Sequence, residues 1–169
     1  MTENPRDLVG NAVIIGGGVA GLMTALCLAP APSVLLSKSP LGVDASTPWA
    51  QGGLAASLGD DDEPALHLAD TLHAGDGLCD AAVSNRIVRA APAAIDALIR
   101  LGVAFDRTSD GHLALGLEAA HSRRRIVHAA GDGTGRELMR ALIEAVRRTP
   151  SITVIEDVEA RRLLVDDNT

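Results

Sequence analysis

Aromatic side chains are nearly absent from this sequence. Its 169 residues include one Trp, one Phe and no Tyr. Aromatic rings bury large areas, so the core must depend on Ala, Leu, Val and Ile, which bury less area per residue. Hydrophobic residues still make up 47% of the chain and charged residues 22%, which excludes a disordered protein. We therefore expect one globular domain of marginal stability on its own.

Cysteine, positive charge and long hydrophobic runs are also scarce. The two cysteines, Cys27 and Cys79, lie far apart without a CxxC spacing, which argues against a disulfide framework or a zinc site. No apolar run approaches the ~18 residues of a membrane span, and residues 1–10 carry acids and a proline where a signal peptide would be basic and then apolar. The net charge of −7 argues against binding to nucleic acid or acidic lipid. These absences predict a cytoplasmic protein without a metal centre, a nucleic-acid partner or a membrane partner.

The order of hydrophobic segments predicts an α/β fold with a parallel sheet. Residues 11–15 form a short β-branched run, which is followed by a glycine-rich turn, a helix over 21–28 and a strand over 34–36. The small, weakly periodic residues 41–59 indicate an extended loop. Further along, we expect helices over 64–74, from Asp80 through Ile87, from Pro92 to 101 and over 134–148, and strands within 103–127, over 152–155 and over 159–165.

A glycine pattern follows the first expected strand. Gly16, Gly18 and Gly21 have the G-x-G-x-x-G spacing between a strand and a helix, which is the context that the dinucleotide fingerprint requires. The first glycine permits a tight turn, the second lets a pyrophosphate approach the backbone, and the third lets the helix lie close to the strand. The alternative is an ordinary glycine-rich turn. The context favours a dinucleotide site.

The end of the second expected strand carries Ser37 and Lys38 in place of the acidic residue that normally holds an adenosine ribose. A serine and a lysine can hydrogen-bond the ribose or the adjacent phosphate. A basic residue here also fits NADP, and a third interpretation is that Lys38 only extends into solvent. The residues alone leave these alternatives open.

A second candidate binding segment is 46–56, which reads Ser-Thr-Pro-Trp-Ala-Gln-Gly-Gly-Leu-Ala-Ala. Its small residues let backbone donors approach a flat ligand, while the hydroxyls of Ser46 and Thr47 and the amide of Gln51 can form directed hydrogen bonds. A flexible glycine loop would explain the glycines but not the Ser, Thr and Gln beside them. The composition therefore favours a ligand-binding loop.

These two segments, with a third, resemble the flavoproteins that include L-aspartate oxidase and the flavin subunits of succinate dehydrogenase and fumarate reductase. The matching segments are Val13-Ile14-Ile15-Gly16-Gly17-Gly18-Val19-Ala20-Gly21-Leu22, then Ser46-Thr47 with Ala50-Gln51-Gly52-Gly53, then His121-Ser122-Arg123-Arg124-Arg125-Ile126-Val127-His128-Ala129 followed by Thr134-Gly135. The third segment is more similar to the aspartate-oxidase members than to the others. The resemblance implies a Rossmann-like FAD-binding domain, of which residues 1–169 would be the N-terminal part.

The resemblance also implies which residues contact FAD. Residues 17–20 would face the pyrophosphate, Lys38 the adenosine, residues 46–53 the flavin and ribityl region, and the backbone of residues 159–160 the adenine. Ser46 stands where the succinate and fumarate enzymes carry a histidine that links covalently to FAD, so a non-covalent cofactor is expected. The full candidate set is Gly16, Gly17, Gly18, Val19, Ala20, Gly21, Lys38, Ser46, Thr47, Pro48, Trp49, Ala50, Gln51, Gly52, Gly53, Glu159 and Ala160.

For the reaction, the resemblance implies oxidation of L-aspartate to iminoaspartate, with oxygen or fumarate as acceptor, as the first step of NAD biosynthesis through quinolinate. Glu118 takes the place of the family's substrate-side catalytic glutamate, and a carboxylate there suits the substrate's amino group. The family's neighbouring arginine is Leu117 here, and its two glycines are Ala119 and Ala120. Without the resemblance, a single Glu on a loop is more often solvated.

Other charged residues leave alternatives open. The three arginines at 123–125 could pair with the substrate or with acidic residues of the same domain, or they could form a solvated turn. His121 and His128 are favoured in structural roles, because their spacing lacks a nearby Cys or acid pair for a metal. The acidic residues 60–63 before Pro64 predict a capped, solvated helix start.

Members of the family continue beyond this length, through a capping domain and a C-terminal helical region. We therefore expect residues 1–169 to be the FAD-binding part of a flavoenzyme, with those other domains absent. A second hypothesis is a fragment of fumarate reductase or succinate dehydrogenase type, and a third is a truncated, non-catalytic nucleotide-binding chain. The expected partners are L-aspartate and, through the reaction product, quinolinate synthase. Uncovered apolar surface predicts either oligomer formation or partial disorder.

Overall fold

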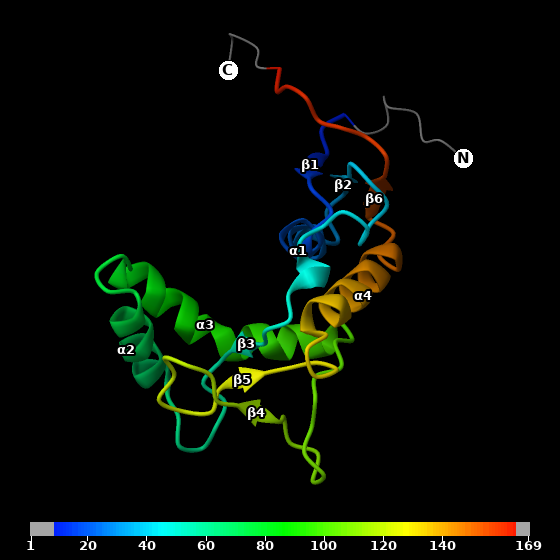
Figure 1. Ribbon diagram of the computed structural model, residues 1–169. Coiled ribbons are helices and arrows are strands. Elements are labelled where there is room, and N and C mark those ends of the chain that lie inside the picture. Colours follow the sequence, from blue (N-terminus) through cyan, green and yellow to red (C-terminus); the bar gives the residue numbers. More distant parts are fainter. Residues whose placement is uncertain (1–8, 165–169) are drawn as a thin grey trace. The chain divides into compact units, whose positions relative to one another are not determined.

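The computed structural model describes residues 9–164, and the chain divides into two compact units. The first unit comprises Met1–Pro48 and Met139–Thr169, and the second comprises Trp49–Leu138. Figure 1 labels the helices and strands of both. Helix α4 (Thr134–Arg147) begins in the second unit and ends in the first.

The first unit contains a three-stranded parallel sheet in the order β1-β2-β6. The strands are β1 (Ala12–Ile15), β2 (Ser33–Leu36) and β6 (Ile152–Ile155), and helix α1 (Val19–Leu28) connects the first two. Ala12 pairs with Ser33, and Ser33 pairs with Ile152. The predicted parallel β-turn-α-β unit and the predicted strand over 152–155 are therefore confirmed.

The core of the first unit lies against its central strand. Val34 and Leu35 of β2 are buried, as are Leu22 and Ala25 of α1, which lie three residues apart on one helix face. Small aliphatic residues therefore fill this core, as the scarcity of aromatics predicted. Cys27 is exposed on α1, although free cysteine is among the residue types most often buried in proteins.

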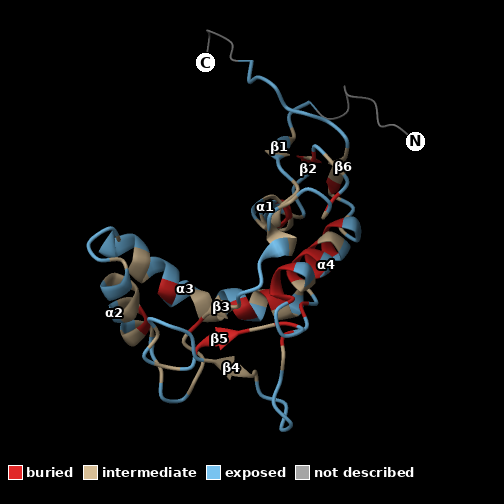
Figure 2. Ribbon diagram, in the orientation of Figure 1, coloured by how far each residue is buried: buried red, intermediate tan, exposed pale blue. Residues whose placement is uncertain are grey.

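The second unit contains a small antiparallel sheet in the order β3-β5-β4. Its strands, each of two residues, are β3 (Leu54–Ala55), β4 (Leu115–Gly116) and β5 (Ile126–Val127). The central strand β5 is buried, as Figure 2 shows in red. The short strands expected within 103–127 are present, whereas β3 lies in a segment predicted to be a loop. Two residues cannot display a strand period, so only the pairing with β5 identifies β3.

Helices α2 (Pro64–Ala74) and α3 (Ala81–Arg100) complete the second unit. The sequence predicted two helices separated at Pro92, but α3 continues through this proline. Val88, Ile95 and Leu98 are buried on one stripe that spans the proline. Continuous burial of this stripe outweighs the hydrogen bond that Pro92 cannot donate within the helix.

The strand expected over 159–165 is not formed in residues 159–164, and Val165 lies outside the described residues. After β6, the chain turns at Asp157, which has a φ of 59°. Leu163 and Leu164 are about four-fifths exposed, at 80% and 82%. Without a neighbouring strand to pair with, these apolar residues do not form a strand. No helix in the part that the structure describes is long and apolar enough to cross a membrane.

Candidate functional site

The glycine turn joins β1 to α1 in the first unit. Gly16 has a φ of +115°, a conformation that glycine adopts without strain, and its N–H donates to the Leu36 carbonyl over 2.9 Å. A Cβ on Gly21 would lie 1.9 Å from the Gly16 carbonyl oxygen. Only glycine therefore allows α1 to begin so close to the strand. These two positions have the geometry expected of the first and third glycines of the fingerprint.

Helix α1 begins two residues earlier than the sequence predicted, at Val19, with Gly18 at the N-cap. The unpaired N–H groups at such a helix end attract anions. The Thr47 hydroxyl accepts a hydrogen bond of 3.4 Å from the Val19 N–H. The second candidate loop is thus joined to the glycine turn within this unit.

A cavity of about 330 Å³ opens beside the glycine turn. Gly16, Gly17, Gly18, Lys38 and Ser46 line it, so five predicted cofactor residues come together there. The cavity is also lined by residues that were not in the predicted set, namely Ser37, Ser39, Pro40, Gly42, Asp44 and Ala45. These residues directly follow β2, and their small size and polarity are the sequence features that could have predicted their place in the cavity. A cation and a helix N-terminus beside one cavity suit a phosphate-containing ligand.

Lys38 and Glu159, both predicted on the adenosine side, form an ion pair of 3.7 Å. Their side chains are 78% and 51% exposed. The Val158 N–H donates to the Ser37 carbonyl over 3.0 Å, which holds this segment beside the end of β2. Glu159 and Ala160 are therefore near Lys38, although they lie in irregular chain and not on the expected strand.

The rest of the second loop belongs to the second unit. A short 3-10 helix, η2 (Thr47–Trp49), ends at Trp49, which is 80% exposed. The Ala50 carbonyl accepts a hydrogen bond of 3.0 Å from the Gly135 N–H. A Cβ on Gly53 would lie 2.3 Å from the Val127 carbonyl oxygen, so this glycine lets the loop approach β5. Gln51 and Gly52 are exposed.

Glu118 lies on the loop between β4 and β5. Its carbonyl accepts a hydrogen bond of 3.2 Å from the His121 N–H, and its carboxylate Oε1 is 3.6 Å from His128 Nε2. Ala120, which replaces a family glycine, has a φ of 68°. The loop thus adopts a left-handed conformation even though an alanine stands there.

A buried ion-pair network fixes the C-terminal half of this loop. The Arg125 side chain is 0% exposed and donates to both carboxylate oxygens of Asp62, at 2.8 and 2.9 Å, and to Asp70 Oδ2 at 2.8 Å. Asp70 Oδ2 also accepts from the Ser122 N–H at 2.7 Å and from the Ser122 hydroxyl at 2.8 Å. Of the alternatives for the three arginines, Arg125 therefore pairs with acidic residues of its own unit.

The same network corrects the expectation of a capped, solvated acidic helix start at two points, the burial of Asp62 and the missing cap. The Asp62 side chain is 0% exposed, and Glu63, the N-cap of α2, makes no side-chain capping hydrogen bond. Asp60, Asp61 and Glu63 are exposed, as the solvated description expects, and Asp61 pairs with Arg123 at 3.7 Å. Sequence spacing gave no signal that Asp62 would meet an arginine 63 residues away.

Two groups around Arg125 have shifted pKa values. Burial acts to raise the pKa of Asp70, but hydrogen bonds from Ser122 and Arg125 outweigh it and lower the pKa. Burial, with the nearby Arg125 and His121, lowers the pKa of His67. The rings of His67 and His121 meet edge to face at 5.6 Å. The network therefore favours an ionised Asp70 beside a neutral His67.

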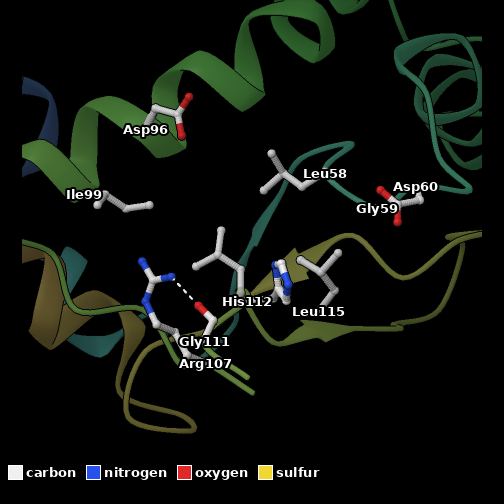
Figure 3. Close-up of a pocket in the computed structure, with 10 residues that line it drawn as sticks. Leu58, Gly59, Asp60, Asp96, Ile99, Arg107, Gly111, His112 and Leu115 are labelled. Atoms are coloured by element: carbon white, nitrogen blue, oxygen red, sulfur yellow. Dashed lines mark hydrogen bonds between the residues drawn. The ribbon is translucent and has the colours of Figure 1, made fainter. Parts of the chain in front are cut away.

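A separate pocket of about 490 Å³ lies within the second unit (Figure 3). Asp96 and Ile99 of α3 face Leu58, His112 and Leu115 across it, and Arg107 donates to the Gly111 carbonyl at 2.7 Å. None of the predicted cofactor residues lines this pocket. Within residues 9–164, no group of three His, Cys, Asp or Glu side chains is placed to hold a metal ion.

A parallel sheet, a strand–glycine–helix turn and a cavity beside the helix N-terminus define a dinucleotide-binding α/β protein. The family model described as "FAD binding domain" matches residues 11–169, and the chain belongs to this family. The cofactor of the family is FAD. The predicted fold class and cofactor are therefore confirmed.

Individual relatives are similar to the chain over nearly all of its length. It is 65% identical over 165 residues to an L-aspartate oxidase from Mesorhizobium japonicum and 62% identical over 156 residues to one from Agrobacterium fabrum. These alignments cover 98% and 92% of this chain but only 32% and 30% of the relatives. The chain therefore spans about a third of the length of the curated relatives it matches.

Solved structures of the wider family have the same fold. The Mycobacterium smegmatis Sdh1 complex in the apo form matches with a TM-score of 0.85 and 28% identity, covering 93% of this chain and 29% of that chain. A quinol-fumarate reductase with menaquinol molecules matches with a TM-score of 0.86 and 30% identity, covering 93% and 28%.

Proposed function

We propose that this chain is the FAD-holding part of an enzyme that oxidises L-aspartate to iminoaspartate. The observation that carries the proposal is the 65% identity to an L-aspartate oxidase over almost the whole chain. Oxygen or fumarate serves as electron acceptor, and the product enters NAD biosynthesis through quinolinate. A cytoplasmic location, functional coupling to quinolinate synthase and assembly into an oligomer belong to the same proposal.

The FAD-contacting residues follow from the cavity and the glycine turn. Residues 17–20 bind the pyrophosphate through their N–H groups, and Lys38 with the segment at 159–160 binds the adenosine side; the N-terminus of α1 and the Lys38–Glu159 pair support this assignment. Residues 46–53 supply small side chains and backbone donors for the flavin. Bound FAD would supply the hydride acceptor, held without a covalent bond because Ser46 lacks the imidazole needed to form one.

On the substrate side, Glu118 accepts hydrogen bonds from the amino group of L-aspartate. A carboxylate suits a protonated amine, and its position on a loop between two paired strands limits how far it can move. Its contribution is to orient the Cα–H bond of the substrate toward the hydride acceptor.

The test is a titration of the purified full-length protein with FAD, followed by anaerobic mixing with L-aspartate. We expect a flavin absorption spectrum that is bleached by L-aspartate. Glu118→Gln should slow this bleaching more than it weakens FAD binding. A protein that retains no flavin after unbound FAD is removed by gel filtration would refute the proposal and favour the non-catalytic nucleotide-binding chain.

A second candidate is a flavoprotein of the succinate and fumarate branch. The fold likeness to a quinol-fumarate reductase, with a TM-score of 0.86 at 30% identity, favours it. Bleaching of the flavin by succinate in place of L-aspartate would select this candidate.

A further inference from the structure

The Glu118 side chain is half exposed, and within residues 9–164 its carboxylate is paired with His128. The backbone of the loop is fixed at several points, since the Arg125 N–H donates to the Gly116 carbonyl over 3.0 Å and Ser122 is bound to Asp70. These contacts fix the backbone near Glu118, but they do not determine which rotamer its side chain adopts. The 3.6 Å contact between Glu118 Oε1 and His128 Nε2 can favour one rotamer of Glu118.

The backbone of His128 is fixed just after β5. Its carbonyl accepts a hydrogen bond of 2.8 Å from the Asp106 N–H, and the preceding Val127 pairs with Leu115. Its side chain is 27% exposed, which is less than the 50% of Glu118. The imidazole is therefore a more restrained group than the carboxylate that it contacts.

Gly116 provides the space that this imidazole occupies. A Cβ built on Gly116 would lie 3.0 Å from His128 Nε2 and 3.4 Å from its Cδ2. The separation from Nε2 is tighter than most contacts of a Cβ atom, so a larger residue at this position would displace the ring by a few tenths of an ångström. The glycine on β4 thus permits the ring on the neighbouring strand to reach Glu118.

We propose that His128 is a positioning residue for Glu118 and that Gly116 makes this contact possible. His128 holds one carboxylate oxygen of Glu118, which leaves the other oxygen to accept a hydrogen bond from the substrate's amino group. This inference rests on the proposed function for its catalytic meaning, whereas the contact itself can be tested without substrate.

The first experiment tests the contact by NMR of the histidine rings. The protein has five histidines, so each ring signal can be assigned by substitution. We expect Glu118→Gln and Gly116→Ala each to shift the His128 ring signals while those of His73, exposed on α2, stay in place. A His128 signal that does not move in Glu118→Gln would overturn the proposal.

The second experiment measures flavin reduction by L-aspartate in stopped-flow mixing. His128→Leu should lower the limiting rate about tenfold, within the loss that a misplacement of about 1 Å produces, and leave the half-saturating concentration within about twofold. His128→Gln retains an N–H donor and should recover most of the rate. His73→Gln is the matched control and should leave it unchanged.

The outcomes distinguish failure of the positioning role of His128 from failure of the proposed function. A normal rate in His128→Leu, or equal losses in the Leu and Gln variants, would overturn the positioning role. If L-aspartate does not reduce the wild-type flavin, the proposed function fails, and the NMR result alone decides whether His128 holds Glu118.

Discussion

Arg125→Met should destabilise the second unit strongly, because it removes a buried cation from two carboxylates. Arg125 makes hydrogen bonds of 2.8, 2.9 and 2.8 Å to Asp62 and Asp70 with no exposed side-chain surface. Methionine fills a similar volume but cannot donate. Asp62, whose side chain is also 0% exposed, would then be a buried carboxylate without its cation.

The expected decrease in the free energy of unfolding comes mainly from Asp62. Removing one partner of a buried ion pair costs about 3–5 kcal/mol, because the remaining charge stays desolvated. Asp70 contributes less, since its side chain is 17% exposed and keeps its hydrogen bonds from Ser122. Divided by a urea m-value of about 2 kcal/mol/M, a loss of about 4 kcal/mol lowers the unfolding midpoint by about 2 M.

The assay is urea unfolding followed by far-ultraviolet circular dichroism. The single Trp, Trp49, is 80% exposed, which makes its fluorescence a poor reporter of unfolding. Arg123→Met is the matched control, because its pair with Asp61 is largely exposed and such pairs contribute at most about 1 kcal/mol. If Arg125→Met and Arg123→Met lower the midpoint equally, the reasoning about the buried charge is refuted.

Two further predictions concern the same loop. Acid should destabilise the protein: the folded-state pKa values of His67 and Asp70 are both lowered, so the unfolded chain binds more protons below pH 6.5 and again below 3.8. The urea midpoint should fall as pH drops through these ranges, and Asp70→Asn should flatten the lower part of this dependence; a midpoint that rises in acid contradicts the assignment. Ala120→Gly should stabilise the protein by about 0.5–1 kcal/mol, because it relieves a left-handed alanine with a φ of 68°. A lower urea midpoint for this variant would show that the loop does not keep that conformation in solution.

Sequence patterns predicted the helices and strands whose stabilising residues lie close together in the sequence. The β1–turn–α1 unit follows from a β-branched run, a glycine spacing and two closing prolines, all within a short segment of chain. The continuity of α3 through Pro92 could not be predicted this way, because it depends on burial of a stripe that only the folded unit provides. The two-residue strands likewise form only through pairing with distant residues.

In the candidate site, too, contacts encoded by local sequence were predicted and contacts between distant residues were not. A dinucleotide site was predicted at Gly16, Gly18 and Lys38, and the structure brings these residues to one cavity after the carboxyl ends of two adjacent strands. The contact between Glu118 and His128 was not predicted, because the two residues are ten positions apart on opposite sides of a loop. It depends on the strand pairing of Gly116 and on the absence of its side chain.

The scarcity of aromatic residues bears directly on how the second unit holds its loop. Arg125 is the largest of the fully buried side chains in the part of the chain described here, a place that a ring commonly takes in other cores. An apolar ring would contribute burial but would not fix the direction of its neighbours, whereas the guanidinium donates hydrogen bonds in fixed directions to the carboxylate oxygens of Asp62 and Asp70. Asp62, Asp70 and Ser122 are therefore bound in one arrangement, and the loop that carries Glu118 is bound with them. The loop is thus held at its C-terminal half by directed polar contacts and at its start by the hydrogen bond from the Arg125 N–H to the Gly116 carbonyl, so much of its geometry depends on hydrogen bonds.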